Sequence, residues 1–104
     1  MTRAAWIYEN GVLCGFSLSG HCGGTAGRDI VCAAVSSAAY MAANTITEVC
    51  GCRAAVTERD GHLEVRVPLA QSARCRDILL GFRLHMEQLA EQYPTHIHLD
   101  KTEE

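Results

Sequence analysis

The sequence predicts an α+β fold, a two-layer sandwich of element order ββαββα in which two helices pack on one face of a small sheet. Two glycine-containing pairs, Asn10-Gly11 and Asp60-Gly61, each lie between segments of alternating polarity and predict β-hairpins. A long segment with helical periodicity follows each hairpin. The chain therefore consists of two ββα units, although no sequence identity between them supports a true repeat.

Residues 2–8 and 12–20 form the first predicted hairpin, and Asn10-Gly11 favours a type I′ turn between them. One face of the second strand is apolar and the other carries serines. Its apolar residues are Cys14, Phe16 and Leu18. By this alternation His21 continues the serine face and points away from the core.

The first helix is predicted from Asp29, as the N-cap, to about Cys50, with Gly51 as the C′ residue. Its apolar residues follow one another at helical spacing and form a single stripe. The stripe comprises Val31, Val35, Ala38, Ala42, Ile46 and Val49. Cys32 is then about the third helical residue, and it shares a face with Ser36 beside the stripe.

Residues 53–59 and 62–67 flank Asp60-Gly61 and form the second predicted hairpin, again with a type I′ turn. Pro68 ends its second strand. Ser72 is the predicted N-cap of a helix that extends to about Tyr93. The apolar stripe of this helix comprises Cys75, Ile78 or Leu79, Phe82, Met86, Leu89 and Tyr93.

Pro94 ends the second helix, and the last residues are less regular. Residues 95–99 are compatible with a short last strand, and 100–104 are predicted to be a disordered tail. No linker or change of composition divides the chain, so residues 1–104 are expected to form a single domain.

The charge and composition limit the classes of function. The net charge is −3 and no basic run is interleaved with aromatic residues, which argues against nucleic-acid binding. Polar residues interrupt the longest apolar run, so no membrane span is expected. The N-terminal residues do not resemble a signal peptide, so a cytoplasmic location is expected. Small domains bury a modest core, which makes a stabilising dimer plausible.

Six cysteines are many for 104 residues. Without a signal peptide they are expected to be reduced thiols, with Cys14 and Cys75 in the core. Cys50-Gly-Cys52 lacks the ligand spacing of a zinc site, and neither a metal nor a cofactor is predicted. Four histidines are predicted to be ordinary surface residues: His62, His85, His96 and His98.

The stretch from Gly20 to Ser37 contains the candidate active site. Gly20 is expected to permit a close approach or a positive φ before His21. A loop with three hinge glycines follows, and it is predicted to be mobile and to order on substrate. This loop consists of Cys22, Gly23, Gly24, Thr25, Ala26, Gly27 and Arg28. Its glycines match no phosphate-binding motif.

Cys32 follows the loop, in the first turn of the predicted helix. A helix start presents unpaired N–H groups and partial positive charge, which stabilise a thiolate. His21 can serve as general base to such a thiol and then as acid to a leaving group. Cys32 and His21 are therefore the predicted catalytic pair.

The sequence leaves alternatives open for the roles of Asp29 and Ser36 and for the class of function. Asp29 is either a plain N-cap or also orients His21 or shapes the oxyanion region, and Ser36 is either helix surface or a polar partner in the site. The chain is either a cysteine endopeptidase, a non-enzymatic interaction protein that docks through its sheet edge, or a thiol-transfer protein with Cys22 as resolving thiol. The C-x-x-C motif typical of the last class is absent.

The order Gly20-His21, glycine-rich loop and Asp29-Ile-Val-Cys-Ala-Ala-Val-Ser36 resembles the bacterial ribosomal-processing cysteine proteases. The likeness continues in pattern to Tyr93-Pro94, with two departures: Cys22 replaces a usual alanine, and the loop is one residue shorter. The resemblance implies an endopeptidase that removes the N-terminal extension of a bacterial large-subunit ribosomal protein precursor. It also implies a Cys32/His21 dyad and a homodimer.

Overall fold

The structure is a computed structural model that describes residues 1–20 and 30–103, with side chains up to residue 100. Along the chain the elements are β1 (Thr2–Glu9), β2 (Val12–Ser19), α1 (Ile30–Asn44), η1 (Thr45–Val49), β3 (Ala55–Arg59), β4 (His62–Arg66), η2 (Leu69–Cys75), α2 (Arg76–Gln92) and β5 (Ile97–Glu103). η1 is a π-helical turn and η2 is a 3₁₀ segment. The predicted ββαββα order is confirmed, and the last strand is present.

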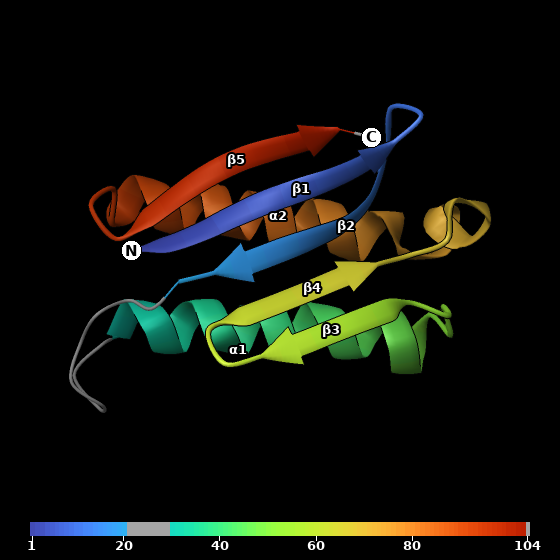
Figure 1. Cartoon of the computed structure of the whole chain (residues 1–104), viewed down its shortest axis with the longest axis horizontal. Helices are drawn as coiled ribbons and strands as arrows, with labels where there is room; N and C mark the ends of the chain where they lie inside the picture. Colours follow the sequence, from blue (N-terminus) through green and yellow to red (C-terminus); the bar gives the residue numbers. More distant parts are fainter. Residues whose placement is uncertain (21–29, 104) are drawn as a thin grey trace.

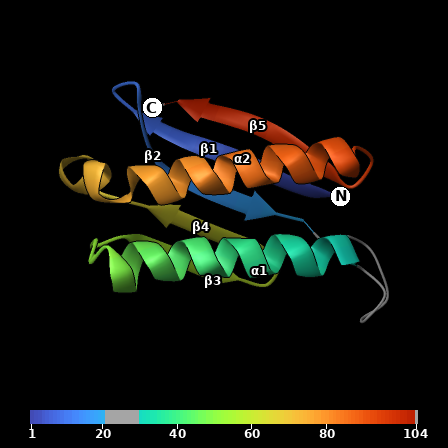
Figure 2. The ribbon, with the colours of Figure 1, turned by 180° about the vertical axis from the view of Figure 1, so that it is seen from behind.

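The five strands form one sheet of order β3-β4-β2-β1-β5 (Figure 1). β5 runs parallel to β1, and the other neighbours are antiparallel. Figure 2 shows α1 and α2 side by side on the same face of the sheet. The predicted two-layer sandwich is thus confirmed, and no helix of the described residues lies on the opposite face of the sheet.

The two hairpin turns differ from one another. Asn10 and Gly11 have φ values of 52° and 76°, as the predicted type I′ turn requires. In the second turn only Gly61 has a positive φ, of 73°, so the predicted type I′ geometry at Asp60-Gly61 is wrong. The hairpin itself still forms, with Arg59 paired to His62.

A β-bulge near the turn of the first hairpin shifts the pairing register of β1 and β2. Tyr8 pairs with Leu13 although Ile7 pairs with Gly15, so Cys14 is the extra residue. Leu13, in place of the predicted Cys14, joins the core cluster on the face that carries Phe16. Cys14 is buried, as predicted, but outside that cluster.

Most of the predicted stripe of α1 is buried against the sheet. The buried residues of α1 and η1 are Val31, Val35, Ala39, Ala42, Ala43 and Ile46. Val49, the predicted last member, is 80% exposed. The Cys50 N–H donates to the Thr45 carbonyl at 2.8 Å, a π-type bond that widens the last turn and rotates Val49 out of the stripe. Gly51 has φ of 67° and is the C′ residue, as predicted.

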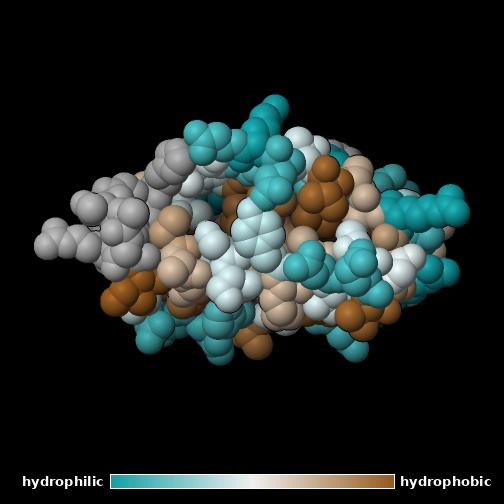
Figure 3. Space-filling view, turned by 90° about the horizontal axis from the view of Figure 1, so that it is seen from below, coloured by the Kyte–Doolittle hydropathy of each residue, from teal (hydrophilic) through white to brown (hydrophobic). Residues whose placement is uncertain are grey.

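The helical stretch Ile30–Val49 is, by length and composition alone, long and apolar enough to cross a membrane. In this fold its buried side chains pack on the sheet, as those of a core helix do. Figure 3 views the side of the molecule on which α1 and β3 lie, and there apolar side chains are scattered among hydrophilic ones. Packing on the sheet therefore accounts for the buried part of this apolar stretch, whereas Ile30, Met41 and Val49 are exposed.

α2 contributes the aromatic centre of the core. Phe82 is 2% exposed, and its ring centroid lies 5.5 Å from that of Trp6 and 4.6 Å from that of Phe16. Ser72 is not the N-cap predicted for this helix, because a 3₁₀ segment precedes it. The Ser72 hydroxyl donates to the Leu69 carbonyl at 2.8 Å within η2, and α2 begins at Arg76.

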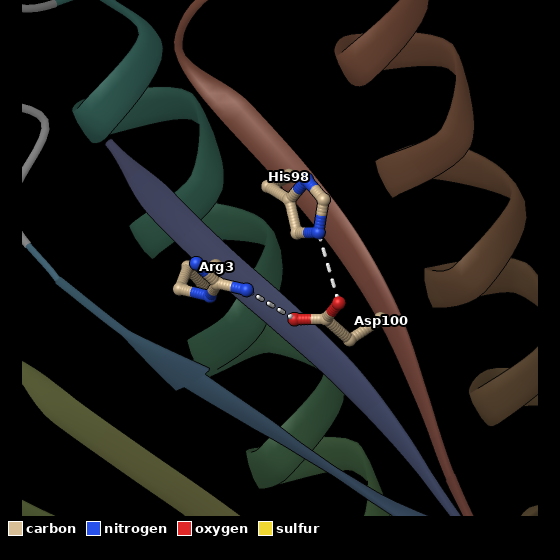
Figure 4. Close-up of polar contacts among 3 residues, drawn as sticks. All are labelled: Arg3, His98 and Asp100. Atoms are coloured by element: carbon tan, nitrogen blue, oxygen red, sulfur yellow. Dashed lines mark hydrogen bonds and ion pairs between the residues drawn. The ribbon is translucent and has the colours of Figure 1, made fainter.

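The tail predicted at 100–104 is largely a strand. The backbone of Asp100–Glu103 pairs in parallel with β1 and covers its outer edge, which satisfies backbone groups that a free tail would leave to water. Asp100 also accepts from Arg3 at 3.2 Å and from His98 at 2.9 Å on the helix-free face (Figure 4). Desolvation alone would raise the pKa of Asp100, but these two bonds outweigh it and lower the pKa.

Candidate active site

A pocket of about 230 Å³ lies between α1 and the β3–β4 hairpin, where β2 ends. Its lining comes from Thr2 in β1 and from three further segments: the end of β2, α1 and the β3–β4 hairpin. The lining residues are Thr2, Leu18, Ser19, Gly20, Cys32, Val35, Ser36, Ala39, Tyr40, Glu58, Arg59, Gly61, His62 and Leu63. Three of the predicted site residues, Gly20, Cys32 and Ser36, are thus brought together on one pocket.

Cys32 is the third residue of α1, as predicted, and its side chain is half-buried at the pocket. Ser36 and Tyr40 follow at intervals of four residues and line the same pocket, which confirms the shared face. The first turn of a helix has backbone N–H groups without intrahelical partners. Such donors beside a thiol can stabilise the oxyanion that forms when a thiolate attacks a carbonyl.

Gly20 directly follows β2, in a conformation that a side chain would disturb. Its φ is 90°, and a Cβ built there would lie 2.4 Å from the carbonyl oxygen of Met1. The Gly20 N–H donates to the Gly61 carbonyl at 3.0 Å, which holds this strand end beside the β3–β4 turn. Both predicted reasons for glycine at this position, the close approach and the positive φ, are confirmed.

His21, the loop from Cys22 to Arg28, and Asp29 lie outside the described residues. The predicted base and acid role of His21 therefore stays a prediction, as do the N-cap at Asp29 and the ordering of the loop on substrate.

Of the other described cysteines only Cys50 shares the partial burial of Cys32, and it lies outside the pocket; none of the five that the structure describes forms a disulfide. Cys14, Cys52 and Cys75 are buried. Burial, followed by the neighbouring Cys52, raises the pKa of Cys75 to about 12, so this thiol is not a nucleophile at neutral pH. Within residues 1–20 and 30–103 no three metal-ligating side chains are arranged to hold an ion.

The pocket also contains polar residues that sequence reasoning missed. Tyr40 and Glu58 face each other across it, and the Tyr40 hydroxyl donates to the Glu58 carboxylate. This bond, with the charge of Glu58, raises the pKa of Tyr40. His62, predicted to be an ordinary surface residue, lines the pocket too. Helical spacing from Cys32 could have pointed to Tyr40, but no local pattern places the hairpin residues opposite α1.

A half-buried thiol in the first turn of a helix, on a pocket between helix and sheet, is a position that suits a nucleophilic cysteine. The family model for cysteine protease Prp matches residues 1–98. The chain belongs to this family of cysteine proteases. Of the three functions considered from the sequence, membership selects the peptidase over the interaction protein and the thiol-transfer protein.

Solved structures share the fold over nearly the whole chain. The essential ribosomal processing protease Prp from S. aureus, in complex with a covalently linked product peptide, superposes with a TM-score of 0.88 at 24% identity and covers 98% of this chain and 100% of that chain. SMU.848 from Streptococcus mutans has a TM-score of 0.83 at 27% identity and covers 100% of this chain and 96% of that chain. No curated protein matches the sequence.

Proposed function

We propose that this protease removes the N-terminal extension of a bacterial large-subunit ribosomal protein precursor, using Cys32 and His21. The observation that carries the proposal is the placement of Cys32 at the start of α1, on the same pocket as Gly20. His21 directly follows Gly20 in the sequence. The substrate class is supported by family membership and by the S. aureus relative, a ribosomal processing protease solved with peptides.

The proposed reaction is acyl transfer in two steps. The Cys32 thiolate attacks the scissile carbonyl, a C–S bond forms and the C–N bond breaks, and His21 gives a proton to the leaving amine. Water then attacks the thioester with His21 as base, which releases the new carboxylate and restores the thiol. Backbone N–H groups at the start of α1 would donate to the oxyanion in both steps.

Further parts of the proposal concern the surroundings of the dyad. Ser36 lies on the pocket one turn after Cys32, so its hydroxyl is placed to contact a bound peptide. Asp29 would cap α1 and, in the second role considered, orient His21. A homodimer and a cytoplasmic location complete the proposal.

Cleavage of the purified precursor tests the dyad and the substrate together. Cys32→Ala is expected to abolish cleavage, because no other residue would form the acyl intermediate. His21→Ala is expected to lose about 10²–10⁴-fold, the usual contribution of general acid–base catalysis. Cys22→Ala is expected to keep most activity, as a loop residue. The product mass identifies the bond that is cut.

Two outcomes would overturn the proposal in different ways. If Cys22→Ala is inactive while Cys32→Ala still cuts, the nucleophile is wrong. If the wild-type protein leaves the precursor intact but cuts other peptides, the ribosomal substrate must be given up, and the same variants then test the dyad on those peptides.

A further inference from the structure

The pocket beside Cys32 continues along α1 to a polar pair at its far end. Cys32, Ser36 and Tyr40 lie on one face of the helix and all line the pocket. Since an α-helix rises about 1.5 Å per residue, Tyr40 lies about 12 Å beyond Cys32 along the axis. An extended peptide advances about 3.3 Å per residue, so this length corresponds to three or four residues of substrate.

Glu58 stands at that far end, on the opposite wall. In the β3–β4 ladder Glu58 is paired with Leu63, a core residue, so its side chain points to the helix side of the sheet. The hydrogen bond from Tyr40 confirms this direction. Arg59, the next residue, alternates with Glu58 along the strand and pairs with His62, and both Arg59 and His62 also line the pocket.

The Glu58 carboxylate has acceptor capacity to spare. It is exposed, and Tyr40 occupies one of its roughly four lone-pair positions. Among the residues that the structure describes, no cation pairs with it; the ion pairs there join Arg3 or His98 to Asp100, and Arg66 to Glu64. A negatively charged acceptor on a substrate pocket, held by a tyrosine and not paired with any described cation, favours a positively charged ligand group, although Arg59 lines the same pocket.

The floor of the pocket has the opposite character. Leu18, Val35, Ala39 and Leu63 line it beneath the polar rim. An apolar floor next to a carboxylate fits a side chain with a long aliphatic stem and a cationic end, which lysine and arginine combine.

We propose that Tyr40 and Glu58 form a specificity subsite that binds a lysine or arginine side chain of the substrate, three or four residues from the scissile bond. The subsite rests on the proposed peptidase activity, but it does not depend on the ribosomal identity of the substrate. Glu58 supplies the charge, and Tyr40 is a positioning residue that holds the carboxylate toward the pocket.

A mixture of synthetic peptides of randomised sequence tests the subsite without assuming a substrate. Mass spectrometry of the products gives the residue frequencies on both sides of each cut. The wild-type protein is expected to enrich lysine and arginine about three- to tenfold at one position, three or four residues from the cut. Glu58→Gln is expected to remove this enrichment, and Glu58→Lys to replace it with a preference for aspartate and glutamate.

Two further variants serve as controls. Glu87→Gln removes an exposed carboxylate of α2 outside the pocket, and it is expected to leave the preference unchanged. Tyr40→Phe removes the donor but not the charge, so the basic preference is expected to weaken and keep its sign. A purely structural role of Tyr40 would lower cleavage of all peptides alike.

The result that overturns the subsite is a wild-type profile without basic enrichment, or one that Glu58→Gln and Glu58→Lys do not change. If the wild-type protein cuts the mixture but not the ribosomal precursor, the proposed substrate fails while the subsite is still judged from the profile. If no peptide is cut, equilibrium binding of lysine-containing and alanine-containing peptides to Cys32→Ala protein decides the subsite, with equal affinities refuting it.

Discussion

Gly20→Ala is expected to separate the geometry of the active site from the stability of the fold. Gly20 has φ of 90°, a backbone conformation that costs a residue with a side chain on the order of 1–3 kcal/mol. The added Cβ would also lie 2.4 Å from the Met1 carbonyl oxygen, whereas ordinary contacts begin at 3.4 Å. The two backbones must therefore move apart by about 1 Å.

This separation of the Gly20 and Met1 backbones would occur at the pocket, because Gly20 is one of its lining residues. A displacement of about 1 Å between reacting groups typically costs about 10²-fold in rate. Gly20→Ala is therefore expected to lose about 10²-fold in kcat/KM beyond any loss of folded protein. Its melting temperature should fall by roughly 4–8 °C for each kcal/mol of backbone cost.

Gly51→Ala is the matched control. Gly51 has φ of 67°, but a Cβ there would meet nothing within 4 Å, and the residue lies outside the pocket. It should be destabilised through its backbone alone and keep its kcat/KM. Peptide cleavage and thermal unfolding of both variants are the measurements. Equal activity in the two variants, after correction for the folded fraction, would refute the argument from Gly20.

Three other predictions test the site and the core. Limited alkylation near pH 7 with peptide mapping should label Cys32 first and leave Cys75, whose pKa burial raises to about 12, unlabelled; the reverse order contradicts the assignment. Phe82→Ala should lower the free energy of unfolding by about 3–5 kcal/mol, while Leu84→Ala, on the exposed side of α2, should change it by less than about 0.5. The fold lowers the pKa of Asp100, so the ionised carboxylate stabilises the protein above about pH 4, and this stabilisation is lost as the pH falls through the lower folded pKa. Asp100→Asn should therefore lose less stability than the wild type on acidification, and equal losses in the two proteins would contradict this.

The sequence predicts those parts of the fold that local chemistry determines. Asn10-Gly11 adopts positive φ at both residues because the type I′ turn needs them, and the apolar spacing around Phe82 places that ring in the core. The predictions are wrong where an irregular feature of the backbone interrupts the helical period or the strand alternation. The π-type turn exposes Val49, and the bulge at Cys14 substitutes Leu13 in the core cluster.

The residues of the candidate site likewise fall into those that local sequence predicted and those that it did not. Cys32 at the start of a helix and Gly20 at a tight strand end follow from residue types at adjacent positions. The opposite wall of the pocket follows from the pairing of β4 with β2, which brings the β3–β4 hairpin beside α1. Neither helical period nor strand alternation contains that information, so Glu58 and His62 were not predicted as pocket residues.

The position of Cys32, the proposed nucleophile, on α1 combines partial burial with closeness to the start of the helix. Val31 is 5% exposed in the core, and one residue of an α-helix turns about 100°, which brings Cys32 to the border of the stripe. A thiol moved to residue 31, in Val31→Cys with Cys32→Ala, should be buried and resist alkylation. A thiol moved one turn on, in Ser36→Cys with Cys32→Ala, should be alkylated but not cleave peptides, because the favourable charge of the helix end falls off within its first turn. Cleavage by the Ser36→Cys double variant would show that access to the pocket alone, without the helix start, makes a thiol catalytic here.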